Sequence, residues 1–296
     1  MPQIHVTAPA KINLSLDITG RREDGYHLLS TVMQSLSLAD RLTVSLDSGG
    51  TGIRLACDQP DIPCDRRNTA WQAAELFLEA ARERAAVTIE ICKKIPAAAG
   101  LAGGSSDAAA VLIALHHLLP GRLNLSQLHE LALRIGADVP FCLQGGTVLC
   151  EGIGDKLKPL SPFSSMPLLL LNPGFEVSTA WAFREFDQTV PARRPQTSQV
   201  IQAMRERDLA RLAETSANVL QPVTFSAWPV LDNARMMLEQ SGAAVCMMSG
   251  SGPTLFALYE TKDLRDAARQ ALTERLDPET RLIACETRSN GPMIIN

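Results

Sequence analysis

The sequence predicts a protein that mixes strands with helices and divides into two domains. The N-terminal half alternates strand and helix patterns, and glycine and proline are dense across residues 152–167, where we place the domain boundary. The chain has 296 residues and a hydrophobic content of 46%, enough for one large core or two modest ones. We therefore expect an N-terminal domain over residues 1–155 and a C-terminal domain over residues 156–296.

The first predicted element is a half-buried strand near the N-terminus. Apolar residues at positions 12, 14, 16 and 18 alternate there with polar residues, and a period of two is typical of a strand with one buried face. This alternation places Lys11 and Asn13 together on the face opposite the core. A turn-rich stretch at residues 21–27 follows, and further strands are predicted at Leu42–Leu46 and Ile53–Cys57.

A helix is predicted next, because Asn68 stands where an N-cap would and apolar residues recur at helical spacing from Trp71 to Ala85. The later elements of the first half are a strand (Val87–Ile91), a glycine-rich loop (Pro96–Asp107), an apolar helix (Ala108 to about Leu119) and a short helix (Ser126–Ile135) ended by Gly136. The second half is predicted to hold helices at Trp181–Phe186 and Trp228–Gln240, a surface loop at Val190–Pro195, a strand at Ala243–Met248 and a turn at Ser249–Pro253.

The composition argues against several classes of protein. Charged residues make up 20% of the chain and the net charge is only −4, so binding to nucleic acid through general electrostatics is not expected. No run of 18 or more apolar residues predicts a membrane span, and the start lacks the features of a secretory signal, so we expect a cytoplasmic protein. The seven cysteines form no C-x-x-C pair, which speaks against a disulfide framework or a structural zinc site.

The glycine-rich segment, residues 96–106, is the strongest local feature. A glycine-rich loop between a strand and a helix lets backbone N–H groups approach an anion, and the partial positive charge of the helix N-terminus adds to the attraction. Ser105 and Ser106 add hydroxyl groups that can donate hydrogen bonds or bind magnesium. The segment matches neither G-x-x-x-x-G-K-[ST] nor G-x-G-x-x-G, so a tight structural turn is the alternative interpretation.

Lys11 and Asp138 are the candidate reacting pair. A kinase needs positive charge near the transferred phosphoryl group and an acceptor for the proton of the attacking hydroxyl. Lys11 projects from a strand face, and Asp138 lies just beyond a helix end, beside a valine and a proline. Taken alone, each is more often a solvated charge, and the sequence does not show that the two side chains meet.

Tyr26, His27 and Phe183 can form an aromatic site for a base, because stacking accepts any flat ring and hydrogen bonds select among the rings. Aromatic residues are only 4% of the chain, so a Tyr-His pair in a polar turn is not readily explained as core. For Phe183, core packing is the alternative. The Gly/Ser turn, residues 249–252, is either a second anion cradle or a plain turn between strands.

Five segments of the chain together resemble one family, the GHMP kinases, and the resemblance spans nearly the whole sequence. The glycine-rich segment is shared across that family. The segments Asp-Gly-Tyr-His and Gly-Ala-Asp-Val-Pro-Phe resemble the members that phosphorylate the 2-position hydroxyl of a cytidine diphosphate-linked methylerythritol in non-mevalonate isoprenoid precursor biosynthesis. The five segments are Pro9–Leu14, Arg22–His27, Pro96–Ala110, Gly136–Phe141 and Ser249–Pro253.

The resemblance implies an α+β GHMP kinase fold of two domains, with the active site in the cleft between them and the ATP-binding part in the N-terminal domain. It implies ATP and Mg²⁺ as cofactors and a small-molecule substrate. The magnesium ligands stay open, with Ser106 and water both possible, and so does the choice between a monomer and a homodimer.

The resemblance also implies roles for single residues. Asp138 would be the base and Lys11 its electrostatic partner. The ATP phosphates would be wrapped by the glycine-rich segment, with Asn68 near the adenosine; the residues concerned are Pro96, Gly100, Leu101, Ala102, Gly103, Gly104, Ser105 and Ser106. The cytidine substrate would be bound between Tyr26 and Phe183, with His27 at the edge of the base and further contacts from Asn13, Ser249, Gly250, Ser251 and Gly252.

Two departures from the family pattern stand out. Ala102 occupies a position where some relatives have another glycine, and a methyl group is tolerated there if the backbone has an ordinary φ. Ile153 stands where many relatives carry a basic residue, so we assign no role to residues 150–155.

Two other classes of protein compete with a cytidine-substrate kinase. A GHMP kinase for a sugar, homoserine or mevalonate would not need Tyr26 and His27. A non-catalytic nucleotide-binding protein on the same fold would have lost Lys11 or Asp138. All four residues are present, which favours the cytidine-substrate kinase.

Overall fold

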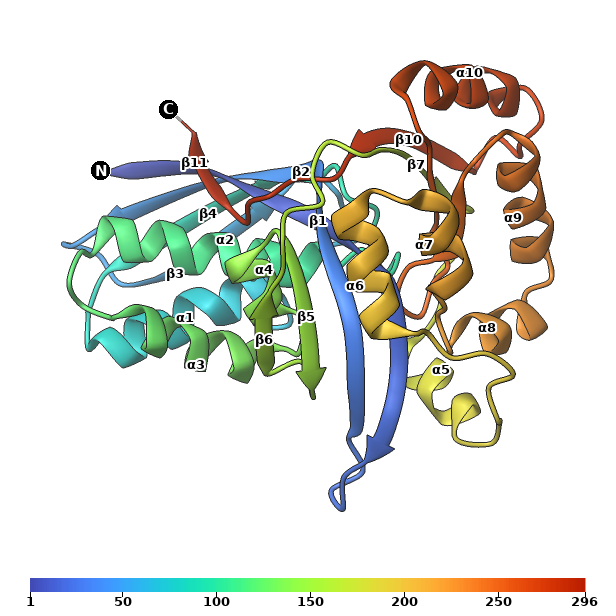
Figure 1. The fold of residues 1–296 in the computed structure, drawn as a ribbon. Helices are drawn as coiled ribbons and strands as arrows, with labels where there is room; N and C mark the ends of the chain where they lie inside the picture. The colour runs from blue at the N-terminus through green and yellow to red at the C-terminus, as the bar shows by residue number, and fades with distance from the viewer. Residues whose placement is uncertain (296) are drawn as a thin grey trace.

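The computed structural model describes residues 1–295, and its strands form two sheets (Figure 1). The strands of the first sheet are β1 (Gln3–Arg21), β2 (His27–Asp47), β3 (Gly52–Cys57), β4 (Ala86–Cys92), β5 (Thr147–Gly152), β6 (Lys156–Pro159) and β11 (Met293–Ile295). They are ordered β11-β1-β2-β4-β3, and β5 pairs with both β2 and β6. Only the β3–β4 pair of this sheet is parallel among the described strands.

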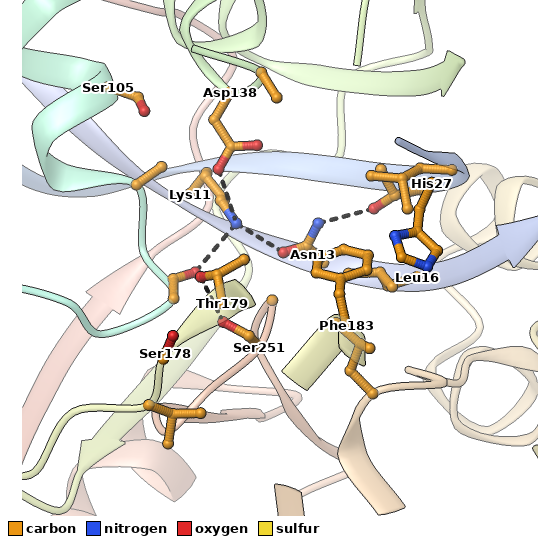
Figure 2. Close-up of a pocket in the computed structure, with 18 of the residues that line it drawn as sticks. Lys11, Asn13, Leu16, His27, Ser105, Asp138, Ser178, Thr179, Phe183 and Ser251 are labelled. Carbon is orange, nitrogen blue, oxygen red and sulfur yellow. Dashed lines mark hydrogen bonds and ion pairs between the residues drawn. The ribbon is translucent and has the colours of Figure 1, made fainter. Parts of the chain in front are cut away.

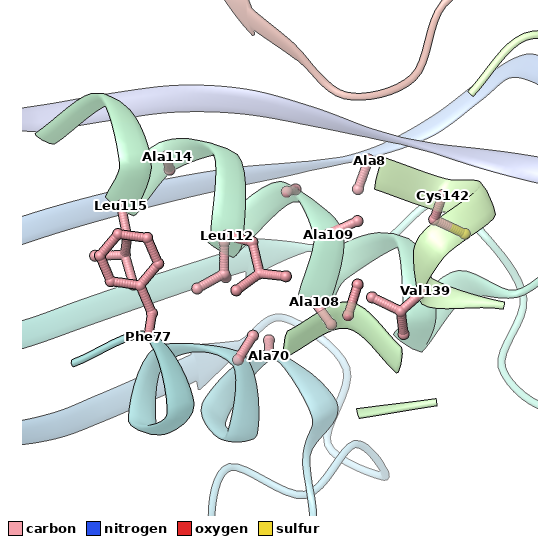
Figure 3. Packing of buried hydrophobic residues seen from close by; sticks show 14 of the residues in the cluster. Ala8, Ala70, Phe77, Ala108, Ala109, Leu112, Ala114, Leu115, Val139 and Cys142 are labelled. Carbon is pink, nitrogen blue, oxygen red and sulfur yellow. The ribbon is translucent and has the colours of Figure 1, made fainter. Parts of the chain in front are cut away.

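Three helices pack against the first sheet, namely α1 (Thr69–Ala81), α2 (Gly103–Leu118) and α4 (Val139–Gln144), and α3 (Leu125–Ile135) packs on these helices. The central one is α2, which contacts β1, β2, α1 and α4. Figure 3 shows Ala108, Ala109 and Leu112 of α2 between the strands and the side chains of Ala70 and Phe77 on α1. Small alanine side chains let α2 approach its neighbours closely, and this packing holds the N-terminus of α2 in a fixed place.

The second sheet has the order β10-β7-β9-β8 with every pair antiparallel, from β7 (Pro167–Asn172), β8 (Val245–Met248), β9 (Leu255–Leu258) and β10 (Arg281–Glu286). Leu168 and Leu170 of β7 face one core cluster, and Leu169 and Leu171 face another, so both sides of this sheet are covered. The helices of this half are α5 (Thr179–Phe186), α6 (Thr197–Glu206), α7 (Leu209–Thr215), α8 (Gln221–Ala227), α9 (Val230–Gln240) and α10 (Lys262–Thr273).

The long strand β1 joins the two halves of the molecule. Its even-numbered apolar residues enter three buried clusters in turn: Val6 and Ala8 in the first, residues 10, 12 and 14 in the second, and residues 16 and 18 in the third. The odd-numbered face carries Lys11 and Asn13, as the alternation predicted, but both are buried rather than exposed. The expectation of a half-buried strand is therefore wrong here, because Thr31, Gly100 and Asp138 contact the polar face as well.

Several predicted elements are confirmed, among them the strands at Ile53–Cys57 and Val87–Ile91, the helix that Gly136 ends, and the helix over Trp181–Phe186. The apolar helix begins earlier than predicted, at Gly103 rather than Ala108, so part of the glycine-rich segment is its first turn. The helix after Asn68 ends at Ala81, before Ala85, because Arg82 takes a left-handed conformation that terminates it.

The predicted strand at Leu42–Leu46 is part of the much longer β2, and the short helix α4 was not predicted. The division of the chain at residues 155 and 156 stays a prediction; β6 and β11, which follow it in the sequence, pair with the first sheet. Within residues 1–295, no helix combines the length and the apolar character needed to cross a membrane.

Candidate active site

A cavity of about 1230 Å³ takes its walls from both halves of the chain. One side is formed by β1, β2, the glycine-rich segment and residues 137–138, and the other by residues 176–179, α5 and the Gly/Ser turn. Figure 2 shows Lys11, Asn13, Asp138 and Ser251 converging on one end of this space, while His27 and Phe183 lie at the other.

Lys11 projects from β1 into the cavity, and its side chain is only 5% exposed. Its Nζ donates to Oδ1 of Asn13 at 2.8 Å and to the carbonyl oxygen of Gly100 at 3.1 Å. The Asn13 amide is held in turn, because its Nδ2 donates to the hydroxyl of Thr31 at 2.8 Å. A buried ammonium group needs such partners, and together they give it one direction.

Asp138 meets Lys11, with Oδ2 lying 3.5 Å from Nζ. The carboxylate stands at the N-cap position of α4 but makes no capping hydrogen bond, so it is free to face the cavity. Pro140 lies in the first turn of α4, where its missing N–H leaves no intrahelical bond unmade. The structure thus brings together two residues that the sequence could not place together, and the Asp138 side chain remains 32% exposed, within reach of a ligand.

The first turn of α2 faces the cavity through Gly103, Gly104 and Ser105. The N-cap residue, Ala102, has no side chain able to bond the first N–H groups, which leaves them available for an anion. Ala102 has a φ of 57°, in the left-handed region. From the sequence, its methyl group is expected to be tolerated if φ is ordinary, and this condition is not met. Ala98 is also left-handed, and strain of this kind persists only where surrounding structure imposes it.

Other residues of the glycine-rich segment hold it in place. Ser106 is fully buried and its hydroxyl donates to the carbonyl oxygen of Pro9 at 2.7 Å, and Leu101 is packed in the core. Ser106 and Leu101, like Pro96, do not line the cavity. Asn68 also lies off the cavity wall, because its side chain caps α1 by accepting from the N–H of Ala70 and donates to the Pro63 carbonyl.

A buried ionic triad, Lys93, Asp40 and Asp107, ties both ends of the glycine-rich segment to β2. Lys93 Nζ lies 2.5 Å from Asp40 and 2.7 Å from Asp107, which belongs to the second turn of α2. The other oxygen of Asp40 accepts from the N–H groups of residues 94 and 95, where the segment begins. Burial raises the pKa of Asp107 to about 7, and the charge of Asp40 adds to this, although Lys93 opposes it.

The far end of the cavity is aromatic. The rings of His27 and Phe183 lie 4.9 Å apart between centroids at an interplanar angle of 33°. Tyr26 also lines the cavity but is 65% exposed, leaving its ring accessible. His27 is held by a residue that the sequence did not single out, since its Nε2 lies 2.6 Å from Oδ1 of Asp187.

The Gly/Ser turn packs directly on the glycine-rich segment. The Ser249 hydroxyl donates to the carbonyl oxygen of Gly100 at 2.9 Å, and a Cβ on Gly100 would meet the Ser249 carbonyl oxygen at 2.3 Å. Gly250 and Ser251 line the cavity, whereas Ser249 and Gly252 do not. Asn218 braces the turn by donating to the carbonyl oxygens of Met248 and Gly250.

Sequence reasoning missed Thr31, Thr179 and Asp187. Thr179 lines the cavity and shares a 3.0 Å hydrogen bond with Ser251. Its local signal was the Ser-Thr pair that starts α5, where Ser178 caps the helix. Thr31 and Asp187 carry no local signal, because strand pairing and domain packing bring them to the site.

The fold and the cavity define a class of small-molecule kinase. Residues 68–146 match the GHMP kinases N terminal domain, and residues 200–277 match the GHMP kinases C terminal domain. The homoserine kinase of Cytophaga hutchinsonii has the same fold, with a TM-score of 0.79 at 21% identity over 100% of this chain and 98% of that one. The chain belongs to the GHMP kinase family and is an ATP-dependent phosphotransferase, as the sequence motifs predicted.

Within this family the chain is similar to one kind of kinase over most of its length. It is 41% identical over 257 residues to the 4-diphosphocytidyl-2-C-methyl-D-erythritol kinase of Clostridium botulinum, which covers 87% of this chain and 91% of that relative. A crystal structure of 4-(cytidine 5'-diphospho)-2C-methyl-D-erythritol kinase matches it with a TM-score of 0.80 and 35% identity, over 97% of this chain and 100% of the other.

Proposed function

We propose that the chain transfers the γ-phosphoryl group of ATP to the 2-position hydroxyl of 4-diphosphocytidyl-2-C-methyl-D-erythritol, a step in non-mevalonate isoprenoid precursor biosynthesis. One observation carries this proposal. A single cavity joins the Lys11–Asp138 pair and the N-terminus of α2 at one end to the aromatic side chains of His27 and Phe183 at the other. The relatives named for this activity match the chain on both sides of that cavity.

In the proposed reaction the substrate hydroxyl oxygen forms a bond to the γ-phosphorus, and the bond from that phosphorus to the β,γ-bridging oxygen breaks. ADP leaves with the electron pair of the broken bond. Asp138 accepts the proton of the hydroxyl and orients it, while the buried ammonium of Lys11 stabilises the negative charge that develops on the phosphoryl oxygens. The free N–H groups at the start of α2 bind the phosphates of ATP.

Magnesium is expected to reach this site with ATP. Among residues 1–295 no group of three or more histidine, cysteine or acidic side chains could hold a metal, which fits an ion bound chiefly by phosphates and water. Glu176 is a carboxylate on the cavity wall that can complete its coordination, whereas Ser106 is fully buried and does not line the cavity. Bound there, the ion would neutralise phosphate charge.

The experiment that tests this function is a substrate panel scored for ADP release. Purified protein is supplied with ATP and, in separate reactions, with the cytidine diphosphate-linked methylerythritol, mevalonate, homoserine or galactose. We expect kcat/KM for the cytidine substrate to exceed that for each other substrate by at least about a hundredfold. Preference for any other substrate would contradict the proposed function, and the chain would then be a GHMP kinase with another substrate. A cytoplasmic location and a monomeric or homodimeric state stay predictions, the latter open to sedimentation analysis.

A further inference from the structure

His27 is held from behind by a carboxylate that does not line the cavity. Asp187 directly follows α5, and its Oδ1 lies 2.6 Å from Nε2 of His27. The other carboxylate oxygen lies 3.1 Å from a guanidinium nitrogen of Arg21. Phe183, one turn earlier in α5, packs against the ring of His27, so the same helix fixes both the plane and the edge of the imidazole.

The charge state of Asp187 decides which ring nitrogen carries a proton. The hydrogen bond from His27 lowers the pKa of Asp187, and the nearby charge of Arg21 lowers it as well, so this side chain is a carboxylate. A carboxylate only accepts hydrogen bonds, and Nε2 of His27 must therefore be the donor. In a neutral imidazole the other nitrogen, Nδ1, is then an acceptor.

The acceptor nitrogen has no hydrogen-bond partner among residues 1–295. His27 lines the cavity, and its side chain is 13% exposed, so Nδ1 is left for a ligand in the cavity. Cytosine and uracil differ in the hydrogen-bonding group that they carry at ring carbon C4. Cytosine has an amino group that donates there, whereas uracil has a carbonyl oxygen that only accepts.

We propose that Asp187 determines the choice of base, by holding His27 in the Nε2–H form so that Nδ1 accepts a hydrogen bond from the exocyclic amino group of cytosine. This inference rests on the proposed function. A uracil in the same position would set its carbonyl oxygen against Nδ1, leaving two acceptors face to face with no proton between them. Discrimination of this kind comes from the repulsive pairing as much as from the attractive one.

The variant that tests the inference is Asp187→Asn. An amide can either accept from Nε2–H or donate to Nε2, so His27 is no longer confined to one tautomer. We expect the ratio of kcat/KM for the cytidine substrate over its uridine analogue to fall at least about tenfold, mainly through KM. The KM for ATP should stay within about twofold, because the nucleotide end of the cavity is untouched.

The matched control is Asp266→Asn. Asp266 is also an aspartate paired with an arginine, but it lies on α10 with Arg265 and does not line the cavity. Its substitution should leave the cytidine-to-uridine ratio unchanged. A loss of discrimination in both variants would point to a general effect of removing charge and would overturn the specific role of Asp187.

A second measurement reads the tautomer directly and does not depend on activity. The ¹⁵N shifts of the His27 ring, assigned with a His27→Gln variant, should show a protonated Nε2 and an unprotonated Nδ1 in the unsubstituted protein near neutral pH. In Asp187→Asn the two nitrogens should move toward averaged shifts. A proton on Nδ1 in the unsubstituted protein overturns the inference, as does an Asp187→Asn enzyme that keeps its full discrimination.

These results separate the inference from the proposed function. If the unsubstituted protein does not phosphorylate the cytidine substrate, the proposed function fails, and the role of Asp187 in choosing the base fails with it even if the ring shows the expected tautomer. If the protein prefers cytidine over uridine but Asp187→Asn does so equally, the function stands and the inference alone fails.

Discussion

Replacing Lys93 with methionine should destabilise the protein, and more so at high pH than at low pH. The substitution keeps the length and apolar stem of the side chain but removes its charge. Asp40 and Asp107 would then face each other with side-chain exposures of 0% and 4% and no counter-charge between them. Removing one partner of a buried ion pair typically costs about 3–5 kcal/mol, because the remaining charge stays buried.

The pH dependence follows from Asp107, whose pKa burial raises to about 7 from the ordinary 3.8. Between about pH 4 and pH 7, Asp107 is therefore protonated in the folded state and ionised in the unfolded state. The free energy of unfolding falls as pH rises through that window, because the folded state binds more protons. Lys93 opposes this rise, and its loss moves the pKa of Asp107 still higher. At about pH 5.5 the proton on Asp107 relieves the repulsion, and we expect the penalty to be smaller by about 1–2 kcal/mol than at pH 8.5.

The assay is urea unfolding followed by circular dichroism at both pH values, with the free energy of unfolding compared between the two proteins. The double variant Lys93→Met with Asp107→Asn is the control, because it removes one of the two buried carboxylates and should recover most of the loss at pH 8.5. A penalty that is equal at the two pH values, or a double variant no more stable than the single one, would refute the reasoning about Asp107.

Four further outcomes are expected. Asp138→Asn should keep the fold and lower kcat by about 10²–10⁴-fold, and a folded variant with near-normal turnover would remove Asp138 from the mechanism. Gly103→Val should weaken ATP binding in calorimetry by about tenfold or more, and the cytidine substrate much less, because a Cβ there meets buried Ile95 at 3.2 Å and Lys93 at 3.3 Å and would displace the first turn of α2, which carries the amides; equal weakening of both would make the segment structural. Tyr26→Ala should raise the KM for the cytidine substrate roughly 5- to 150-fold and spare that for ATP, while an effect on ATP alone would contradict a base platform. Ala102→Gly should stabilise the protein by about 0.5–1 kcal/mol in thermal unfolding by relieving a left-handed alanine, and a loss of stability would show that the strain is not there.

Local patterns in the sequence were enough to predict much of the secondary structure. Asn68 as an N-cap, Gly136 as a helix end and the alternation over Val87–Ile91 all have the predicted structure, because each depends on contacts within a few residues of the chain. The motifs were also sufficient for the family, since the spacing of short segments along the chain is itself a property of the sequence.

The start of α2 was not predicted correctly from local patterns in the sequence. The glycines and serines at positions 103–106 predict a loop, because their intrinsic helix propensity is poor. In the folded protein they form the first turn of α2, where packing of the apolar turns that follow and the triad with Lys93 outweigh propensity. Ala102, directly before this turn, has a left-handed conformation that an alanine side chain does not favour.

By itself the sequence determined which residue types stand on which local elements, including the Lys11–Asn13 face of β1 and the Tyr-His turn after it. Only the tertiary structure decided that Lys11 meets Asp138, that the polar face of β1 is buried, and that Asp187 stands behind His27. The physical reason is that periodicity and capping are short-range effects. Contacts between distant segments depend on strand pairing and on how the two sheets pack, which many residues decide together.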